Sequence, residues 1–298
     1  MYGGGRVPSV VAMTLTDTEK SEIDAANSSG KQPVVFVHGL WLLSSSWDRW
    51  RQLFEAAGYA TIAPGWPDDP ETVADARENP EVFAHKMVQG VTDHYLEAIA
   101  ALTTKPAVVG HSFGGLIAQK IAGESASAVT VAVDPAPFRG VLPLPISSLK
   151  SAFPVLGNPA NSGKAVSLTL EEFKYGWANA LSDEEAAQLH EDYHVAAPGA
   201  PLFEAASANL NPFSHVKVKT KKAVDRGPML LISGEKDHTV PWAITNSSYK
   251  RQQRNEAVTE ITEIADRGHS LTIDHGWQEV AQTALDFVAR FAPATPSA

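Results

Sequence analysis

The stretch Val108-Val109-Gly110-His111-Ser112-Phe113-Gly114-Gly115 decides the fold of this chain. An apolar, β-branched run ends at a glycine, and the residues after the later glycines have the apolar periodicity of a helix. The stretch therefore predicts a strand, a sharp turn and a helix. The turn has the pattern G-x-S-x-G, whose small residues let strand and helix pack closely and expose the serine. Ser112 is thus a candidate nucleophile, and the backbone N–H of Phe113 would point to where an oxyanion forms.

Apolar segments on both sides of this stretch alternate between strand and helix patterns. Buried or half-buried strands are expected at 34–37, 60–63, 107–109, 129–133, 229–232 and 258–264. Helices are expected from Ser46 to Gly58, over a long stretch after Pro80, after Ser112, and near the end from Trp277 to Phe291. Such alternation predicts an α/β fold with a mostly parallel, doubly wound sheet.

The alternation stops after Asp134-Pro135. Residues 136–224 are rich in proline and apolar residues, with helical pieces only at 170–178 and 183–193. We expect this segment to be an inserted, mainly helical cap on a core formed by residues 33–135 and 225–298. Residues 1–32 are expected to form a partly irregular extension, with an edge strand at 11–15 and a polar, loosely attached segment at 16–32.

Composition limits the classes of partner. The chain has 298 residues, 44% of them hydrophobic, without the run of roughly 20 apolar residues that a membrane crossing requires. Its 24 basic residues are scattered and are outnumbered by 34 acidic ones, which gives a net charge of −10. Neither nucleic acid nor a membrane is an expected partner. The absence of cysteine excludes a thiol nucleophile and disulfides, and the first residues are too polar for a secretory signal, so a cytoplasmic location is expected.

Two loops supply candidate partners for the serine. A serine hydroxyl needs a base, and the base needs a group that orients it. Asp237 follows the strand at 229–232, and His269 follows the strand that ends near Ile264. Because the carboxyl ends of parallel strands share one edge of the sheet, both loops are expected beside Ser112.

These motifs, in this order, resemble those of the α/β-hydrolase superfamily, in particular small bacterial serine esterases and cofactor-free haloperoxidases. The resemblance runs from the first buried strand to the last helix. It implies that Ser112 is the nucleophile, His269 the general base and later acid, and Asp237 the carboxylate that holds the imidazole tautomer. It also implies an oxyanion hole formed by the backbone N–H groups of Leu40 and Phe113.

Other acids and histidines compete for these roles. Asp134 ends the strand that follows the turn helix, where some relatives carry the acid, so it is the main competitor of Asp237. Asp266 is expected to be an ordinary loop residue. His38 and His111 are expected to support the turns by hydrogen bonds, and His238 and His275 have no obvious partner. None of these residues has convincing metal-ligand spacing, so neither a metal nor a cofactor is expected.

The serine at the turn favours an acyl-enzyme that water hydrolyses, and it departs from epoxide hydrolases and haloalkane dehalogenases, which need a carboxylate there. The apolar cap and the tryptophans favour a small hydrophobic ester; Trp41, Trp66 and Trp177 are candidates to line the pocket, with packing as the alternative. A perhydrolase or haloperoxidase, a carbon–carbon bond hydrolase, an amidase, a lactonase, a cyanohydrin lyase and a hydrolase-like ligand receptor stay open. A homo-oligomer is compatible with the sequence.

Overall fold

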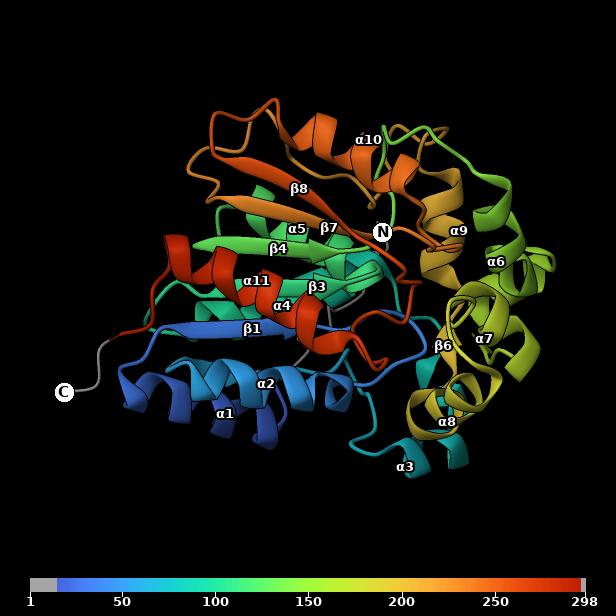
Figure 1. Cartoon of the computed structure of the whole chain (residues 1–298), viewed down its shortest axis with the longest axis horizontal. Helices are drawn as coiled ribbons and strands as arrows, with labels where there is room; N and C mark the ends of the chain where they lie inside the picture. Colours follow the sequence, from blue (N-terminus) through green and yellow to red (C-terminus); the bar gives the residue numbers. More distant parts are fainter. Residues whose placement is uncertain (1–14, 296–298) are drawn as a thin grey trace, which may run out of the picture.

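A single parallel sheet forms the centre of the computed structural model, which describes residues 15–295 (Figure 1). Its strand order is β2-β1-β3-β4-β7-β8, and all neighbouring strands are parallel. The strands are β1 (Pro33–Val37), β2 (Ala60–Ile62), β3 (Ala107–His111), β4 (Val129–Val133), β7 (Met229–Gly234) and β8 (Thr259–Ile264). Four of them, β1, β3, β4 and β7, are buried along their whole length, which explains their continuous apolar runs. The predicted α/β class and parallel sheet are confirmed.

Helices cover both faces of the sheet because alternate strand residues point to opposite sides. On one face, Val34 and Phe36 pack against α2 (Asp48–Ala56) and α11 (Trp277–Phe291). On the other face, Val35 and Val37 share a core with α1 (Asp17–Ser29), α4 (Val88–Ala100) and α5 (Phe113–Gly123). Helix α10 (Trp242–Gln252) packs against β7 and β8. Figure 1 shows α11 in front of the sheet and α4 behind it.

Helix α1 corrects the expectation of a loosely attached segment at 16–32. Thr16 caps this helix: its side chain accepts the N–H of Glu19, and the Glu19 side chain accepts the N–H of Thr16. Ile23 and Ala26 are buried in the main core. The polar composition concealed a short apolar stripe and a capping box. The edge strand expected at 11–15 falls, except for Leu15, outside the described residues.

The prediction of one long helix after Pro80 is also wrong in part. A short 3-10 helix, Pro80–Phe83, is followed by a turn in which His85 has a φ of 64°, and α4 begins only at Val88. A further short helix, α3 (Val73–Glu78), precedes Pro80 and was not expected. Apolar residues at four-residue spacing cannot by themselves distinguish one helix from two segments that pack on the same core.

The segment between β4 and β7 forms the predicted helical cap. It contains α6 (Ile146–Leu156), α7 (Leu170–Gly176), α8 (Asp183–Tyr193), α9 (Ala200–Ser207) and a two-stranded antiparallel sheet of β5 (Ala165–Val166) and β6 (Ala197–Pro198). The helical pieces expected near 170–178 and 183–193 correspond to α7 and α8, whereas α6 and α9 were not expected. Figure 1 shows the cap beyond the arrowheads of the central strands, over the carboxyl edge of the sheet. Within residues 15–295, no helix combines the length and apolar character needed to cross a bilayer.

Candidate active site

The turn between β3 and α5 holds Ser112 in a strained backbone conformation. Its φ of 57° and ψ of −121° are unusual for a residue with a side chain. Two glycines make the turn sterically feasible: a Cβ on Gly110 would lie 2.1 Å from the carbonyl oxygen of Gly114, and one on Gly114 would lie 2.0 Å from that of Val37. The G-x-S-x-G pattern is therefore required by the packing of α5 against β3 and β1.

Ser112 is the first member of a hydrogen-bonded chain of three side chains. Its Oγ lies 2.9 Å from Nε2 of His269, and Nδ1 of His269 lies 2.6 Å from Oδ2 of Asp237. Since a carboxylate only accepts hydrogen bonds, Nδ1 carries the hydrogen and Nε2 is left with a lone pair for the serine hydroxyl. The side chains of His269 and Asp237 are fully buried. The structure thus brings together the three residues selected from the sequence.

Asp237 is fixed by the loop that follows β7. Its Oδ1 accepts the backbone N–H groups of Thr239 at 2.6 Å and Val240 at 2.8 Å, which leaves Oδ2 free to accept from His269. The same loop is attached to the cap, because the Thr239 hydroxyl donates to the carbonyl oxygen of Gly176 at 2.7 Å. The carboxylate is therefore held in one orientation by backbone groups.

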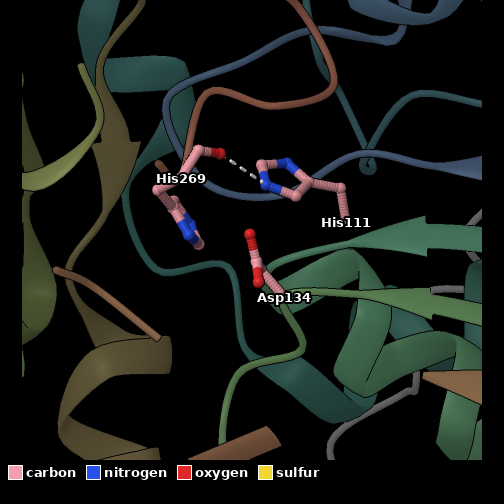
Figure 2. A group of neighbouring side chains, drawn as sticks. All are labelled: His111, Asp134 and His269. Carbon is pink, nitrogen blue, oxygen red and sulfur yellow. Dashed lines mark hydrogen bonds between the residues drawn. The ribbon is translucent and has the colours of Figure 1, made fainter. Parts of the chain in front are cut away.

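His111 and Asp134 lie beside the imidazole of His269 (Figure 2). Nε2 of His111 donates to the carbonyl oxygen of His269 at 2.9 Å, which fixes the His269 backbone. Burial, together with the neighbouring His269, lowers the pKa of His111 well below its usual range, so this ring is neutral. The prediction that His111 supports the site through a hydrogen bond agrees with this geometry.

Asp134 is attached to the backbone at the end of β7. Its Oδ1 accepts the N–H of Gly234 at 2.8 Å, and the residue is fully buried. Burial first, and then the nearby charge of Asp237, raise the pKa of Asp134 well above its usual range. The hydrogen bond from the imidazole goes to Asp237, the acid preferred from the sequence.

One atom each of His111, Asp134 and His269 lies within 4.8 Å of the others, a spacing that resembles a metal site. However, both ring nitrogens of His269 and Nε2 of His111 already take part in hydrogen bonds. An ion there would have to displace the contacts that align the serine. The donor set therefore fits a hydrogen-bonded acid–base assembly better than a metal site.

The loop after β1 lies directly over the serine turn. A Cβ on Gly39 would lie 2.9 Å from the carbonyl oxygen of His111, 2.9 Å from Cβ of Ser112 and 3.5 Å from N of Phe113. This close approach brings Leu40, the next residue, to the turn. Phe113 is the first residue of α5, so its N–H has no partner within that helix. The two N–H groups expected to form an oxyanion hole thus come from neighbouring backbone segments.

A buried polar cluster supports this loop, and two of its members, Asp69 and Lys86, were not expected from the sequence. Nδ1 of His38 donates to the carbonyl oxygen of Gly39 at 2.9 Å, and Nε2 lies 3.2 Å from a carboxylate oxygen of Asp69. Asp69 also pairs with the buried ammonium of Lys86. Asp69 and Lys86 belong to irregular connections, where residue spacing carries no information on contacts. The supporting role expected for His38 agrees with these bonds.

An apolar cavity of about 170 Å³ opens beside Ser112, between the sheet and the cap. The residues that line it carry no charged side chain; among them are Trp41, Ser112, Phe113, Phe138, Leu149 and Val240. Trp41 connects the two parts of the molecule, because its indole N–H donates to the carbonyl oxygen of Val166 in the cap at 3.0 Å. The cavity can hold an uncharged, apolar group next to the serine hydroxyl.

The other two tryptophans expected in the pocket lie elsewhere. The ring of Trp66 stacks on His38 at 5.7 Å, and its N–H donates to the His38 carbonyl oxygen at 3.2 Å. Trp177 packs edge-to-face on His269, with the ring centroids 4.7 Å apart. Both tryptophans are buried and stabilise the site residues, which corrects the expectation that they line the cavity.

The remaining candidates lie away from the serine. Nδ1 of His238 is 2.9 Å from the carbonyl oxygen of Tyr175, and Nδ1 of His275 is 2.8 Å from a carboxylate oxygen of Glu185. Asp266 pairs with Lys236 at the surface, as expected for a loop acid. These side chains hold the cap and the loops together.

Comparison with known proteins identifies the family. The sequence pattern of the Alpha/beta hydrolase family matches residues 34–283. The chain belongs to this family. Among solved structures, this α/β hydrolase is similar to a monoacylglycerol lipase from Paleococcus ferrophilus, with 21% identity, a TM-score of 0.60, and coverage of 88% of this chain and 98% of the lipase.

Two further solved structures resemble the α/β hydrolase at lower identity. A pyrethroid hydrolase from Sphingobium faniae is 15% identical, with a TM-score of 0.60 and coverage of 88% of this chain and 98% of that one. A putative non-heme bromoperoxidase from Mycobacterium tuberculosis is 18% identical, with a TM-score of 0.59 and coverage of 87% and 92%. No curated protein is a significant match. At these identities the likeness to solved structures shows the fold alone.

Proposed function

We propose that this α/β hydrolase is a serine esterase that cleaves small, uncharged, hydrophobic carboxylic esters through an acyl-enzyme on Ser112. The continuous hydrogen-bonded chain from Ser112 through His269 to Asp237 carries this proposal. That chain supplies a nucleophile, a neutral base with its lone pair directed at the hydroxyl, and a buried carboxylate that orients the base.

Acylation begins when Oγ of Ser112 attacks the ester carbon while its proton moves to Nε2 of His269. The carbonyl π bond becomes an oxyanion, which the N–H groups of Leu40 and Phe113 stabilise; each such donor is worth about 3 kcal/mol in the transition state. The oxyanion collapses, the alcohol leaves with the proton from His269, and the acyl group stays on Oγ.

Deacylation repeats these steps with water in place of the serine. His269 removes a proton from the water as its oxygen attacks the acyl carbon, and then returns a proton to Oγ as the acid leaves. Asp237 stabilises the imidazolium formed at each stage, because the buried pair has little solvent to screen it.

The cavity indicates the class of substrate. Without a charged side chain in its lining, it offers no partner for an acyl group or alcohol that carries a carboxylate or an ammonium. Burial of such a charge without a partner would be unfavourable, so esters with uncharged groups are favoured. The lipase named among the similar structures acts on an ester of this kind, which supports the proposal.

A perhydrolase is the second candidate. Its support is the resemblance to a putative bromoperoxidase together with the same three side chains. If hydrogen peroxide replaces water at deacylation, the product is a peracid and every other step is unchanged. Assays of the purified protein with amides, lactones and substrates for carbon–carbon bond hydrolysis would test the other reactions that the sequence left open. A cytoplasmic location stays a prediction.

The test compares wild type with Ser112→Ala. Wild type should be labelled by a fluorophosphonate probe and should hydrolyse neutral p-nitrophenyl esters, whereas Ser112→Ala should lose labelling and about 10⁶-fold in kcat. The matched control is Ser28→Ala, because Ser28 is exposed on α1 and does not line the cavity; it should keep both properties. Equal turnover in Ser112→Ala would exclude the serine mechanism. Ligand-dependent binding of another protein, without turnover of any ester, would favour the receptor.

A further inference from the structure

Exposed apolar side chains lie on, or directly after, two cap segments that also line the cavity. On and before α6, Ile146 is 84% exposed and Phe153 is 68% exposed; after α9, Leu210 is 89% exposed and Phe213 is 85% exposed. We call the following residues the apolar rim: Leu142, Leu144, Ile146, Leu149, Phe153, Leu210 and Phe213. Three of them, Leu142, Leu144 and Leu149, also line the cavity that contains Ser112.

The two segments of the apolar rim are joined to each other. The N–H of Gly140 donates to Oδ1 of Asn209 at 2.6 Å, and Nδ2 of Asn209 donates to the carbonyl oxygen of Val141 at 2.8 Å. Helices α6 and α9 are in contact and lie at the same end of the molecule (Figure 1). The exposed residues therefore belong to one surface that continues into the cavity. Clustered exposed apolar residues of this kind mark a binding surface for a protein or a membrane.

Charge selects between those occupants. Residues 136–169 contain three cations, Arg139, Lys150 and Lys164, and no carboxylate, in a chain with a net charge of −10. Lys150 lies on α6 among the apolar residues and is exposed. In contrast, a hollow beside α1 is lined by six carboxylates: Glu19, Glu22, Asp48, Asp68, Asp69 and Glu71. An anionic surface would attract the cap segment 136–169 and repel the part of the molecule near α1.

We propose that the apolar rim docks on the surface of an anionic lipid aggregate, so that an ester molecule passes from the lipid into the cavity beside Ser112. This inference rests on the proposed esterase function and extends it to lipid esters. It differs from the expectation drawn from the sequence, where scattered basic residues argued against a membrane. The reason is that residues 136–169, which hold five of the seven apolar-rim residues, contain cations and no acid. Apolar side chains would enter the interface, and the cations would contact the head groups.

The test measures docking without catalysis. Ser112→Ala should co-sediment with vesicles of phosphatidylglycerol and phosphatidylcholine, and less with pure phosphatidylcholine. Adding Ile146→Ser, Phe153→Ser and Phe213→Ser should weaken binding at least about tenfold, because apolar area is lost from the interface. The matched control, Val224→Ser with Val258→Ser, removes exposed apolar residues outside the apolar rim and should leave binding unchanged.

Charge-reversal variants and turnover assays test the docking proposal separately. Lys150→Glu with Lys164→Glu should weaken binding to the anionic vesicles, whereas Lys31→Glu with Lys105→Glu, also exposed, should have a smaller effect. When the triple serine variant is made in the active protein, which retains Ser112, it should hydrolyse soluble p-nitrophenyl acetate like wild type. The reason is that none of the three substituted positions lines the cavity. Its turnover of a micellar ester should fall with its loss of binding.

Several outcomes would overturn the docking proposal. They are absence of vesicle binding by Ser112→Ala, equal binding by the triple variant, or a stable dimer of wild type that the triple variant converts to a monomer without any vesicle binding. The last result would assign the apolar rim to a second copy of the chain. Normal turnover of soluble esters in any of these cases would leave the esterase function standing, so failures of the two proposals are distinguishable.

Discussion

Oδ2 of Asp237 lies 2.6 Å from Nδ1 of His269, and both side chains are fully buried. Asp237→Asn keeps the shape but offers an amide that can rotate its N–H₂ toward the ring and favour the wrong tautomer. We expect a folded protein in which kcat falls by about 10⁴-fold. Steady-state hydrolysis of a p-nitrophenyl ester measures this loss, with circular dichroism as the check on folding.

Asp134→Asn is the matched comparison. The amide oxygen can still accept the N–H of Gly234, and a neutral group replaces a carboxyl whose pKa burial and the charge of Asp237 raise. We therefore expect kcat to fall less than about tenfold. If Asp134→Asn were the more damaging change, the acid of the triad would be Asp134.

The same variant tests a pH dependence of stability. The raised pKa means that folded Asp134 keeps its proton at pH values where the unfolded side chain, with its usual value near 3.8, has ionised. The folded state then binds more protons, so this group's contribution to stability is complete below the usual value and is lost as pH rises. The free energy of unfolding of Asp134→Asn should therefore increase relative to that of wild type as the pH rises from 4 to 8. Urea titrations across this range measure the difference, and a constant difference would contradict it.

Gly39→Ala tests the oxyanion loop. The added Cβ would lie 2.9 Å from the carbonyl oxygen of His111 and from Cβ of Ser112, so the loop that carries Leu40 must move away from the serine. We expect kcat to fall by about 10²-fold, since one oxyanion donor is displaced. Gly163→Ala is the control, because its nearest atom would be a ring carbon of His85 at 3.3 Å. Unchanged kcat in a folded Gly39→Ala would argue against this oxyanion hole.

Gly114→Ala tests the packing of the turn. Its Cβ would lie 2.0 Å from the carbonyl oxygen of Val37, a backbone atom of a central strand that cannot rotate away. We expect the free energy of unfolding to fall by about 3 kcal/mol or more. Urea denaturation of this variant beside Gly163→Ala checks the value.

The central sheet and the three site residues were predictable because each depends on local pattern and chain order. The β-branched run that ends at Gly110 fixes the strand, and the carboxyl ends of parallel strands bring the loops of Asp237 and His269 to the same edge. Ser112 itself stands out because only a strained turn requires glycines on both sides of it.

Contacts between irregular segments were not predictable. The pairing of Asp69 with His38 and Lys86 depends on how two connections fold back on the loop after β1, and no periodicity records that. Trp66 and Trp177 were expected in the pocket because their size suits a ligand wall, yet the same size suits packing against an imidazole. Helix α1 was missed because two buried residues, Ile23 and Ala26, supply its entire apolar contact in a polar segment.

The covalent intermediate gives the most direct test of the account. Wild-type enzyme mixed with a p-nitrophenyl ester and quenched in acid within milliseconds should show a burst of p-nitrophenol, and mass spectrometry should find the acyl group on the peptide that contains Ser112. Steady release of p-nitrophenol without an adduct, or an adduct on a different residue, would contradict nucleophilic catalysis by Ser112.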